Sequence, residues 1–144
     1  MEESFKKTTD FILRWEGYKS DDPKDKGGRT IFGISERIYP KEVEKMWNMP
    51  EEDAKAIAIN IYLRDYWTPL NCDAIQYPMD VIAMDCAVNQ GIFVARRFIK
   101  EARDPCDYLM KRIERYCAGD GRYLRGWINR IIALHKMIQN DELL

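Results

Sequence analysis

Three residues near the N-terminus have the side chains and the spacing that acid–base chemistry on a sugar requires. Asp25 lies nine residues after Glu16, and Thr30 lies fourteen residues after it. Breaking a glycosidic bond needs a protonated carboxyl group that donates to the leaving oxygen, and a second group that orients water or stabilises the positive charge developing on the sugar. We expect Glu16 to be the acid, Asp25 the second group and Thr30 a hydrogen-bond partner of the same water.

Each of these residues also has an ordinary structural explanation. A glutamate before a helix-ending glycine usually lies at the surface, and an aspartate in a glycine-rich segment usually shapes a turn. Thr30 could be only a strand residue. The order and spacing of the three residues favour the catalytic interpretation only in combination with motifs elsewhere in the chain.

The elements around these residues can be predicted from local signals. The first helix should begin after Ser4, its expected N-cap, and end at Gly17, which leaves Glu16 in its last turn. Turn-forming residues fill positions 20–29 and cannot continue the helix. Residues 30–34 are therefore expected to form a short strand that closes a small hairpin.

The rest of the chain predicts helices. They are expected from Pro50 to about Tyr66, from Pro78 as the buried central helix, from Asp104 and Pro105 to Gly119, and over the amphipathic stripe of residues 124–138. We therefore expect a mainly α fold in one domain, residues 1–144. A first helix and a small N-terminal β-hairpin wing (4–36) should precede a helical lobe (50–140).

Composition excludes several other classes of protein. No apolar run approaches the ~20 residues that cross a bilayer, and the N-terminus lacks the apolar segment of a secretory signal. We expect synthesis in the cytoplasm, without a signal peptide and without stable membrane insertion. The four cysteines form no close pair of ligands and are expected to be reduced and mostly buried. With a single histidine in the chain, no metal site is predicted.

The small net charge of −1 hides an uneven distribution. Residues 96–136 carry eleven basic against five acidic residues, a net charge of +6, whereas residues 1–85 carry a net charge of −5. A basic half could meet nucleic acid or an anionic wall polymer, but the charge alone is better explained by solvated helix faces. No nucleic-acid recognition motif accompanies the charge, so we rank that function last and expect no nucleic-acid partner.

Motifs along most of the chain resemble one family. The first are Glu16-Gly17, Asp22-Pro23, Asp25-x-Gly27-Gly28-x-Thr30 and Phe32-Gly33-Ile34-Ser35. They are followed by Tyr62-x-x-Asp65-Tyr66-Trp67, Asp85-x-Ala87-Val88-Asn89-x-Gly91, Arg115-Tyr116 and Gly126-Trp127-Ile128-Asn129-Arg130. Together they resemble glycoside hydrolase family 108, which includes phage and bacterial N-acetylmuramidases. The spacing of Glu16, Asp25 and Thr30 is also similar to that of phage-type lysozymes.

The resemblance implies a lysozyme-like α+β fold and a defined activity. The expected substrate is bacterial peptidoglycan, cut at the β-1,4 bond between N-acetylmuramic acid and N-acetylglucosamine, with no cofactor. Tyr18 stands where the family usually has a second glycine, so we expect it to contact substrate and alter subsite preference. The compact segment 89–115 also lacks a longer stretch that resembles a wall-binding module in the family.

Several further residues have candidate roles. Tyr66 could stack on a sugar ring, and Asn89 is expected to contact substrate. Asp85 shares a helix face with Asn89 and is expected to be structural. Trp127 is expected in the core, and His135 without a catalytic role.

Alternative functions remain open at this point. If Asp25 and Thr30 act on water, hydrolysis should invert the anomeric configuration. A lytic transglycosylase would need an acid such as Glu16 but no aspartate to hold water. A non-catalytic wall-binding or secretion-assisting protein would need neither the acid nor the aspartate. The wall in the periplasm could be reached through holin pores, as by a phage or prophage endolysin. Release of a bacterial protein by lysis or by a dedicated transporter fits the sequence equally.

Overall fold

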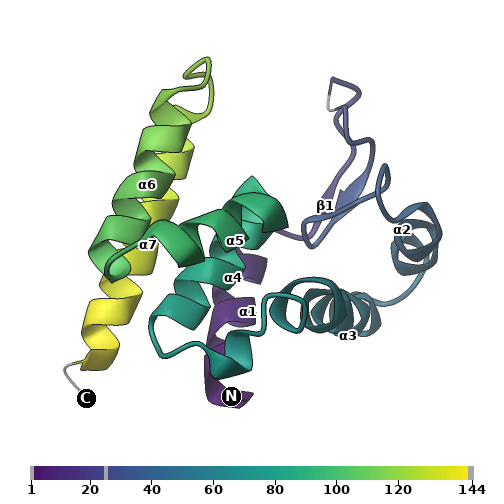
Figure 1. Ribbon diagram of the computed structural model, residues 1–144. Helices are drawn as coiled ribbons and strands as arrows, with labels where there is room; N and C mark the ends of the chain where they lie inside the picture. Colours follow the sequence, from purple (N-terminus) through teal and green to yellow (C-terminus); the bar gives the residue numbers. More distant parts are fainter. Residues whose placement is uncertain (1, 25, 143–144) are drawn as a thin grey trace. The chain divides into compact units, whose positions relative to one another are not determined.

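The computed structural model describes residues 2–24 and 26–142. The chain divides into two compact units. The sheet unit comprises Thr9–Asp65, and the helical unit comprises Met1–Thr8 together with Tyr66–Leu144. Figure 1 shows the order of the elements along the chain. Among the described helices, none is both long enough and apolar enough to cross a membrane.

The first helix, α1, spans Glu2–Glu16. Its end is predicted correctly, because Gly17 follows at a φ of +74° and terminates the helix directly after Glu16. The expected N-cap is wrong: Ser4 lies inside the helix, where its carbonyl accepts a 2.6 Å hydrogen bond from the Thr8 hydroxyl. The acidic residues Glu2 and Glu3 in the first turn favour the earlier start, since they interact well with the positive end of the helix dipole.

A small antiparallel sheet follows, with the strand order β1-β2-β3. The strands are β1 (Lys19–Ser20), β2 (Thr30–Ile31) and β3 (Ile34–Ser35). The single strand expected over residues 30–34 is therefore wrong. Phe32 and Gly33, with φ values of +50° and +76°, form a two-residue turn between Ile31 and Ile34. Positive φ at both central residues is what the tight hairpin turn of type I′ requires.

Two helices complete the sheet unit. Helix α2 (Pro40–Trp47) is not among the predicted elements, although Pro40 in its first turn is a recognisable start signal. Helix α3 (Glu51–Tyr62) continues into one π-helical turn, η1 (Leu63–Trp67), and together they confirm the helix predicted from Pro50 to about Tyr66. Val43 and Met46 of α2 are fully buried, so this short helix contributes to the core of the unit.

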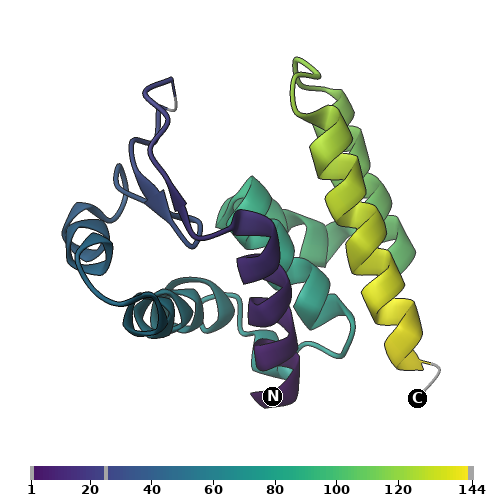
Figure 2. The ribbon, with the colours of Figure 1, turned by 180° about the vertical axis from the view of Figure 1, so that it is seen from behind.

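The helical unit is built around α4. Its elements are η2 (Cys72–Ala74), α4 (Met79–Gln90), α5 (Ile92–Glu101), α6 (Pro105–Cys117) and α7 (Leu124–Glu142). The central helix is confirmed, because residues 81–87 of α4 are all buried. The Asp104 cap of α6 is also confirmed, since its carboxylate accepts a 2.8 Å hydrogen bond from the Asp107 amide. Helices α6 and α7 run side by side (Figures 1 and 2).

The mainly α fold with a small β wing agrees with the prediction, whereas the cysteines agree only in part. All four thiols are free, but Cys106 and Cys117 are exposed and only Cys72 and Cys86 are buried. The prediction of mostly buried cysteines is therefore wrong for the pair on α6. Burial raises the pKa of the Cys72 thiol to about 12, so this thiol stays protonated at neutral pH.

A buried ion triad joins three helices of the helical unit. Asp85 of α4 is completely buried between Arg130 of α7 and Arg112 of α6. One carboxylate oxygen accepts hydrogen bonds from Arg130 Nη2 at 2.8 Å and Nε at 3.1 Å. The other oxygen lies 2.9 Å from Arg112 Nη1. Burial alone would raise the pKa of Asp85, but the two guanidinium charges outweigh it and hold the pKa below its usual range.

Substitution of Asp85 by asparagine is predicted to be strongly destabilising. Asp85→Asn leaves two buried guanidinium groups without their counter-charge, which should cost about 3–5 kcal/mol of unfolding free energy. Urea unfolding at pH 7 measures the loss, with the exposed Asp21→Asn as the control expected to stay within about 0.5 kcal/mol of the parent. A loss below about 1 kcal/mol would contradict a stabilising role for the triad.

The same ion triad sets a direction for the pH dependence. Because the pKa of Asp85 is lower in the folded than in the unfolded chain, its contribution is complete above the unfolded value of about 3.9. The contribution then falls as the pH drops through the folded value, so the difference between the parent and Asp85→Asn should shrink in acid.

Candidate active site

Glu16 is the last residue of α1 and is half-buried against the β2–β3 turn. The backbone of Gly33 packs directly on its side chain. A Cβ atom added to Gly33 would lie 2.7 Å from Glu16 Cγ and 2.8 Å from the Tyr62 hydroxyl oxygen. Only glycine fits this position, so the turn restricts where the stem of Glu16 can lie.

Tyr62 of α3 contacts the same turn through a hydrogen bond. Its side chain is completely buried, and its hydroxyl donates a hydrogen bond to the Phe32 carbonyl oxygen. On the other side, the Phe32 amide donates to the Tyr18 carbonyl oxygen at 2.7 Å. The rings of Tyr18 and Phe32 also pack, with their centroids 5.0 Å apart. These contacts keep Phe32 at positive φ, a conformation that a non-glycine residue rarely adopts.

Thr30 lies on the middle strand of the sheet. It pairs with Ser20 of β1 and Ser35 of β3, and its side chain is half-buried. Successive strand residues point to opposite faces, so Thr30 faces away from the buried Ile31. Asp25, the third predicted catalytic residue, lies outside the described residues.

A salt-bridge cluster fixes the segment that leads into β2. Arg29 Nη2 lies 2.8 Å from Glu36 and 2.6 Å from Glu44, and its guanidinium group lies 5.0 Å from the centre of the Trp47 ring. The Glu36 carboxylate also accepts a 3.0 Å hydrogen bond from the Arg29 amide. These hydrogen bonds from Arg29 hold the pKa of Glu36 below its usual range. The cluster therefore anchors β2 just before Thr30.

The predicted site residues are divided between the two units. Glu16, Tyr18 and Thr30 belong to the sheet unit, where the turn at Phe32 and Gly33 connects them structurally. Tyr66 and Asn89 belong to the helical unit. Tyr66 lies half-buried in η1.

Asn89 lies in the last turn of α4, where its side-chain oxygen accepts a hydrogen bond from the Tyr116 hydroxyl. It borders a pocket of about 390 Å³ on the helical unit. The lining residues are Asn89, Gln90, Arg115, Tyr116, Ala118, Gly119 and Trp127. Trp127 is half-buried at this pocket, so the prediction that it belongs to the core is wrong.

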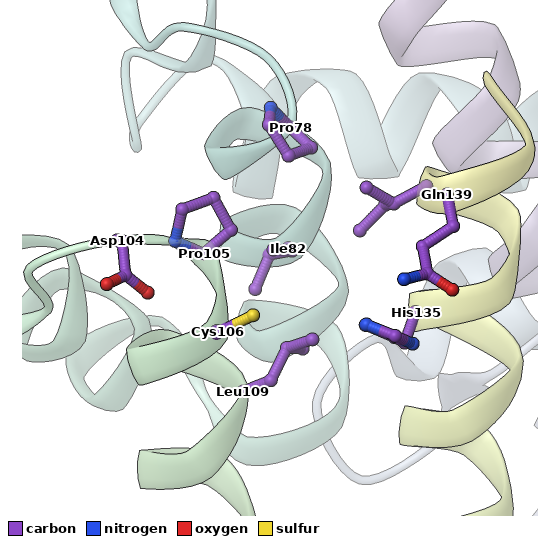
Figure 3. A pocket seen from close by; sticks show the side chains of 9 residues that line it. Pro78, Ile82, Asp104, Pro105, Cys106, Leu109, His135 and Gln139 are labelled. Atoms are coloured by element: carbon purple, nitrogen blue, oxygen red, sulfur yellow. The ribbon is translucent and has the colours of Figure 1, made fainter. Parts of the chain in front are cut away.

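A second pocket, of about 350 Å³, contains His135. Figure 3 shows His135 and Gln139 of α7 opposite Cys106 and Leu109 of α6. Within residues 2–24 and 26–142, no group of three histidine, cysteine or acidic side chains could hold a metal ion. The walls of the His135 pocket are mainly apolar, and none of the predicted catalytic residues lines this pocket.

Sequence reasoning missed the residues that hold Glu16 in place. Gly33 and Tyr62 both stand in the recognised motifs, but nothing in their local sequence shows that they meet. The partners of Asp65 were also not predicted: its carboxylate accepts a 2.9 Å hydrogen bond from the Tyr39 hydroxyl and forms an ion pair with Arg64. The only available signal was the motif Tyr62-x-x-Asp65, which places both side chains on one turn of helix.

Comparisons with known proteins identify one matching family model and one solved structure with a similar fold. Residues 9–91 match the family model described as Glycosyl hydrolase 108. No curated protein matches the chain in sequence. Among solved structures, the chain is similar to the one titled "Structure of Brucella abortus SagA", with a TM-score of 0.77 and 17% identity over 97% of this chain and 96% of the other. At that identity the likeness shows the fold alone.

Substitution of Gly33 by alanine is predicted to disturb both stability and the position of Glu16. The positive φ costs about 1–2 kcal/mol for any side chain, and the overlap with Glu16 and Tyr62 adds to it. Gly121→Ala is the matched control, because Gly121 has a φ of +80° and no atom near its added Cβ. Thermal unfolding should therefore show a larger loss for Gly33→Ala, and equal losses would contradict the packing against Glu16.

Proposed function

Because the chain belongs to the glycosyl hydrolase 108 family, we propose that it is a peptidoglycan hydrolase of the N-acetylmuramidase type. Its substrate would be the β-1,4 bond between N-acetylmuramic acid and N-acetylglucosamine, and the whole chain, residues 1–144, would act as one catalytic domain. The observation that carries the proposal is the placement of Glu16. A half-buried carboxyl group ends a helix, and a glycine turn and a buried tyrosine restrict its side chain.

Glu16 would donate its proton to the leaving oxygen as the glycosidic bond breaks. A general acid must be held in a fixed geometry relative to that oxygen, and the contacts of Gly33 with the stem of Glu16 supply such a constraint. Asp25 would orient the attacking water, and Thr30 would hydrogen-bond the same water from the middle strand. No cofactor enters the proposed reaction.

Three further residues would contact the glycan strand. Tyr18, packed on Phe32 beside the turn, would border the sugar near Glu16. Tyr66 would stack on a sugar ring, and Asn89 would donate a hydrogen bond to the strand. Action on the wall requires that the protein reach the periplasm, and we propose holin-dependent release, as for an endolysin.

Substitution of Glu16 by glutamine is predicted to reduce the catalytic rate strongly without unfolding the protein. Removing a general acid costs about 10²–10⁴-fold in rate, and glutamine keeps the shape of the side chain. Turbidity loss of purified peptidoglycan sacculi measures the rate, and mass analysis of the released fragments identifies the bond that is cut. Reducing muropeptides are expected from the parent.

The controls separate activity from folding. Glu3→Gln changes an exposed glutamate of the same helix and should clear sacculi at the parental rate. Anhydro-sugar products would identify a lytic transglycosylase instead. If the parent binds sacculi and releases no fragment, the protein is a wall-binding or secretion-assisting protein and the catalytic proposal fails.

The stereochemistry of the product is a separate prediction. If Asp25 and Thr30 act on water, the new reducing end should first appear with inverted anomeric configuration. Proton NMR during the first minutes of digestion of a soluble glycan oligomer, before mutarotation, distinguishes the two anomers. A product that retains its configuration would contradict direct attack by a water that Asp25 and Thr30 orient.

A further inference from the structure

The pocket beside Asn89 lies entirely within the helical unit. The last turn of α4 contributes Asn89, the last turn of α6 contributes Arg115, and the first turn of α7 contributes Trp127. Its volume of about 390 Å³ is in the range of small-molecule sites. None of the motifs around Glu16 contributes to it.

Aromatic rings form one wall of this pocket. The rings of Tyr116 and Trp127 are stacked, with centroids 4.8 Å apart and planes inclined by 21°. Tyr123 packs on Trp127 with a centroid distance of 5.9 Å. Tyr116 is buried and Trp127 is half-buried, so the indole is held on a fixed support while part of it stays accessible. An accessible aromatic surface of this kind suits the apolar face of a sugar ring.

The polar groups of the pocket are hydrogen-bond donors. Asn89 accepts from the Tyr116 hydroxyl through its oxygen, which leaves its amide hydrogens for a ligand. Gln90 is occupied: its oxygen accepts from Arg112 Nε at 2.8 Å, and its amide donates to the Arg112 carbonyl. The guanidinium group of Arg115 forms no ion pair with any described residue. With the Arg115 guanidinium group and the Asn89 amide as donors and no acidic lining residue, the pocket suits a ligand that supplies acceptor oxygens and a negative charge.

The buried triad keeps the donors in place. Arg112, held by Asp85, also donates a 3.2 Å hydrogen bond to the Tyr116 hydroxyl oxygen. Burial raises the pKa of Tyr116, so its phenol stays protonated and continues to donate to Asn89. The orientation of the Asn89 amide is thus fixed through Tyr116 before any ligand arrives.

We propose that this pocket binds an N-acetylated sugar that carries a carboxylate, the muramic acid residue of the glycan strand. The ring lies against Trp127, the carboxylate pairs with Arg115, and the Asn89 amide donates to an oxygen of the sugar. The choice of ligand rests on the proposed function. The carboxylate has two possible sources, the lactyl group of a peptide-free strand or the amino acid of a stem that is trimmed to one residue.

Matched sugars test the proposal directly. Soluble N-acetylmuramic acid and N-acetylglucosamine differ only in the lactyl ether and its carboxylate. Titration into ¹⁵N-labelled protein should shift the Trp127 indole signal, identified with Trp127→Phe. N-acetylmuramic acid should bind about tenfold more tightly, which one charge-assisted hydrogen-bond pair supplies. N-acetylmuramoyl-L-alanine, titrated in parallel, shows whether a peptide carboxylate is accepted as well.

The variant Arg115→Gln should remove the preference and bind both sugars equally. Arg125→Gln changes an exposed arginine of α7 outside the pocket and should keep the preference. Equal affinity of the parent for the two sugars, or shifts confined to other parts of the chain, would overturn the proposal. Failure of the proposed function is visible separately, because clearing of sacculi by the parent is measured without Arg115 variants.

Discussion

The buried carboxylate of Asp85 is the constraint on which the helical unit depends. A charge removed from water must be paired closely, and unpairing it costs several kcal/mol. Asp85 meets this requirement through Arg112 of α6 and Arg130 of α7, so one carboxylate links three helices. Arg112 also donates hydrogen bonds to the side chains of Gln90 and Tyr116, and both residues line the pocket at the end of α4. A structural ion triad thereby fixes the geometry of a surface site.

In the sheet unit the corresponding constraint is steric. Phe32 and Gly33 occupy the left-handed region, and the turn brings backbone so close to Glu16 that no side chain fits at Gly33. Tyr62 closes the arrangement by donating to the Phe32 carbonyl. Glu16 is therefore positioned by close packing against Gly33, which has no side chain. Asn89 is positioned by its hydrogen bond with Tyr116, which Arg112 of the ion triad holds in turn. Both arrangements restrict a side chain in the folded protein, and such preorganisation lowers the entropic cost of binding wherever a ligand is bound.

Local signals predicted the elements better than the contacts between them. Gly17 marks the end of α1, and Asp104 marks the start of α6, because each signal acts within one turn of helix. The turn at Phe32 escaped prediction, since an aromatic residue in an apolar run is typical of a strand. The arginine partners of Asp85 also escaped it: Arg130 is 45 residues away, and periodicity carries no information on such pairs. Asp85 could be predicted as structural, but its partners could not.

Burial and ion pairing also determine how much positive charge the basic segment 96–136 exposes. Arg112 and Arg130 are buried and share the single negative charge of Asp85. Arg97 and Arg103 each pair with an acid four residues later in the chain. Exposed ion pairs contribute little to stability, but they reduce the field that a polyanion would meet. Because Arg112 and Arg130 are buried, the basic surface is smaller than the net charge of the segment suggests. At the pocket beside Asn89, the exposed guanidinium group of Arg115 lies next to an aromatic wall. This arrangement favours recognition of a single carboxylate.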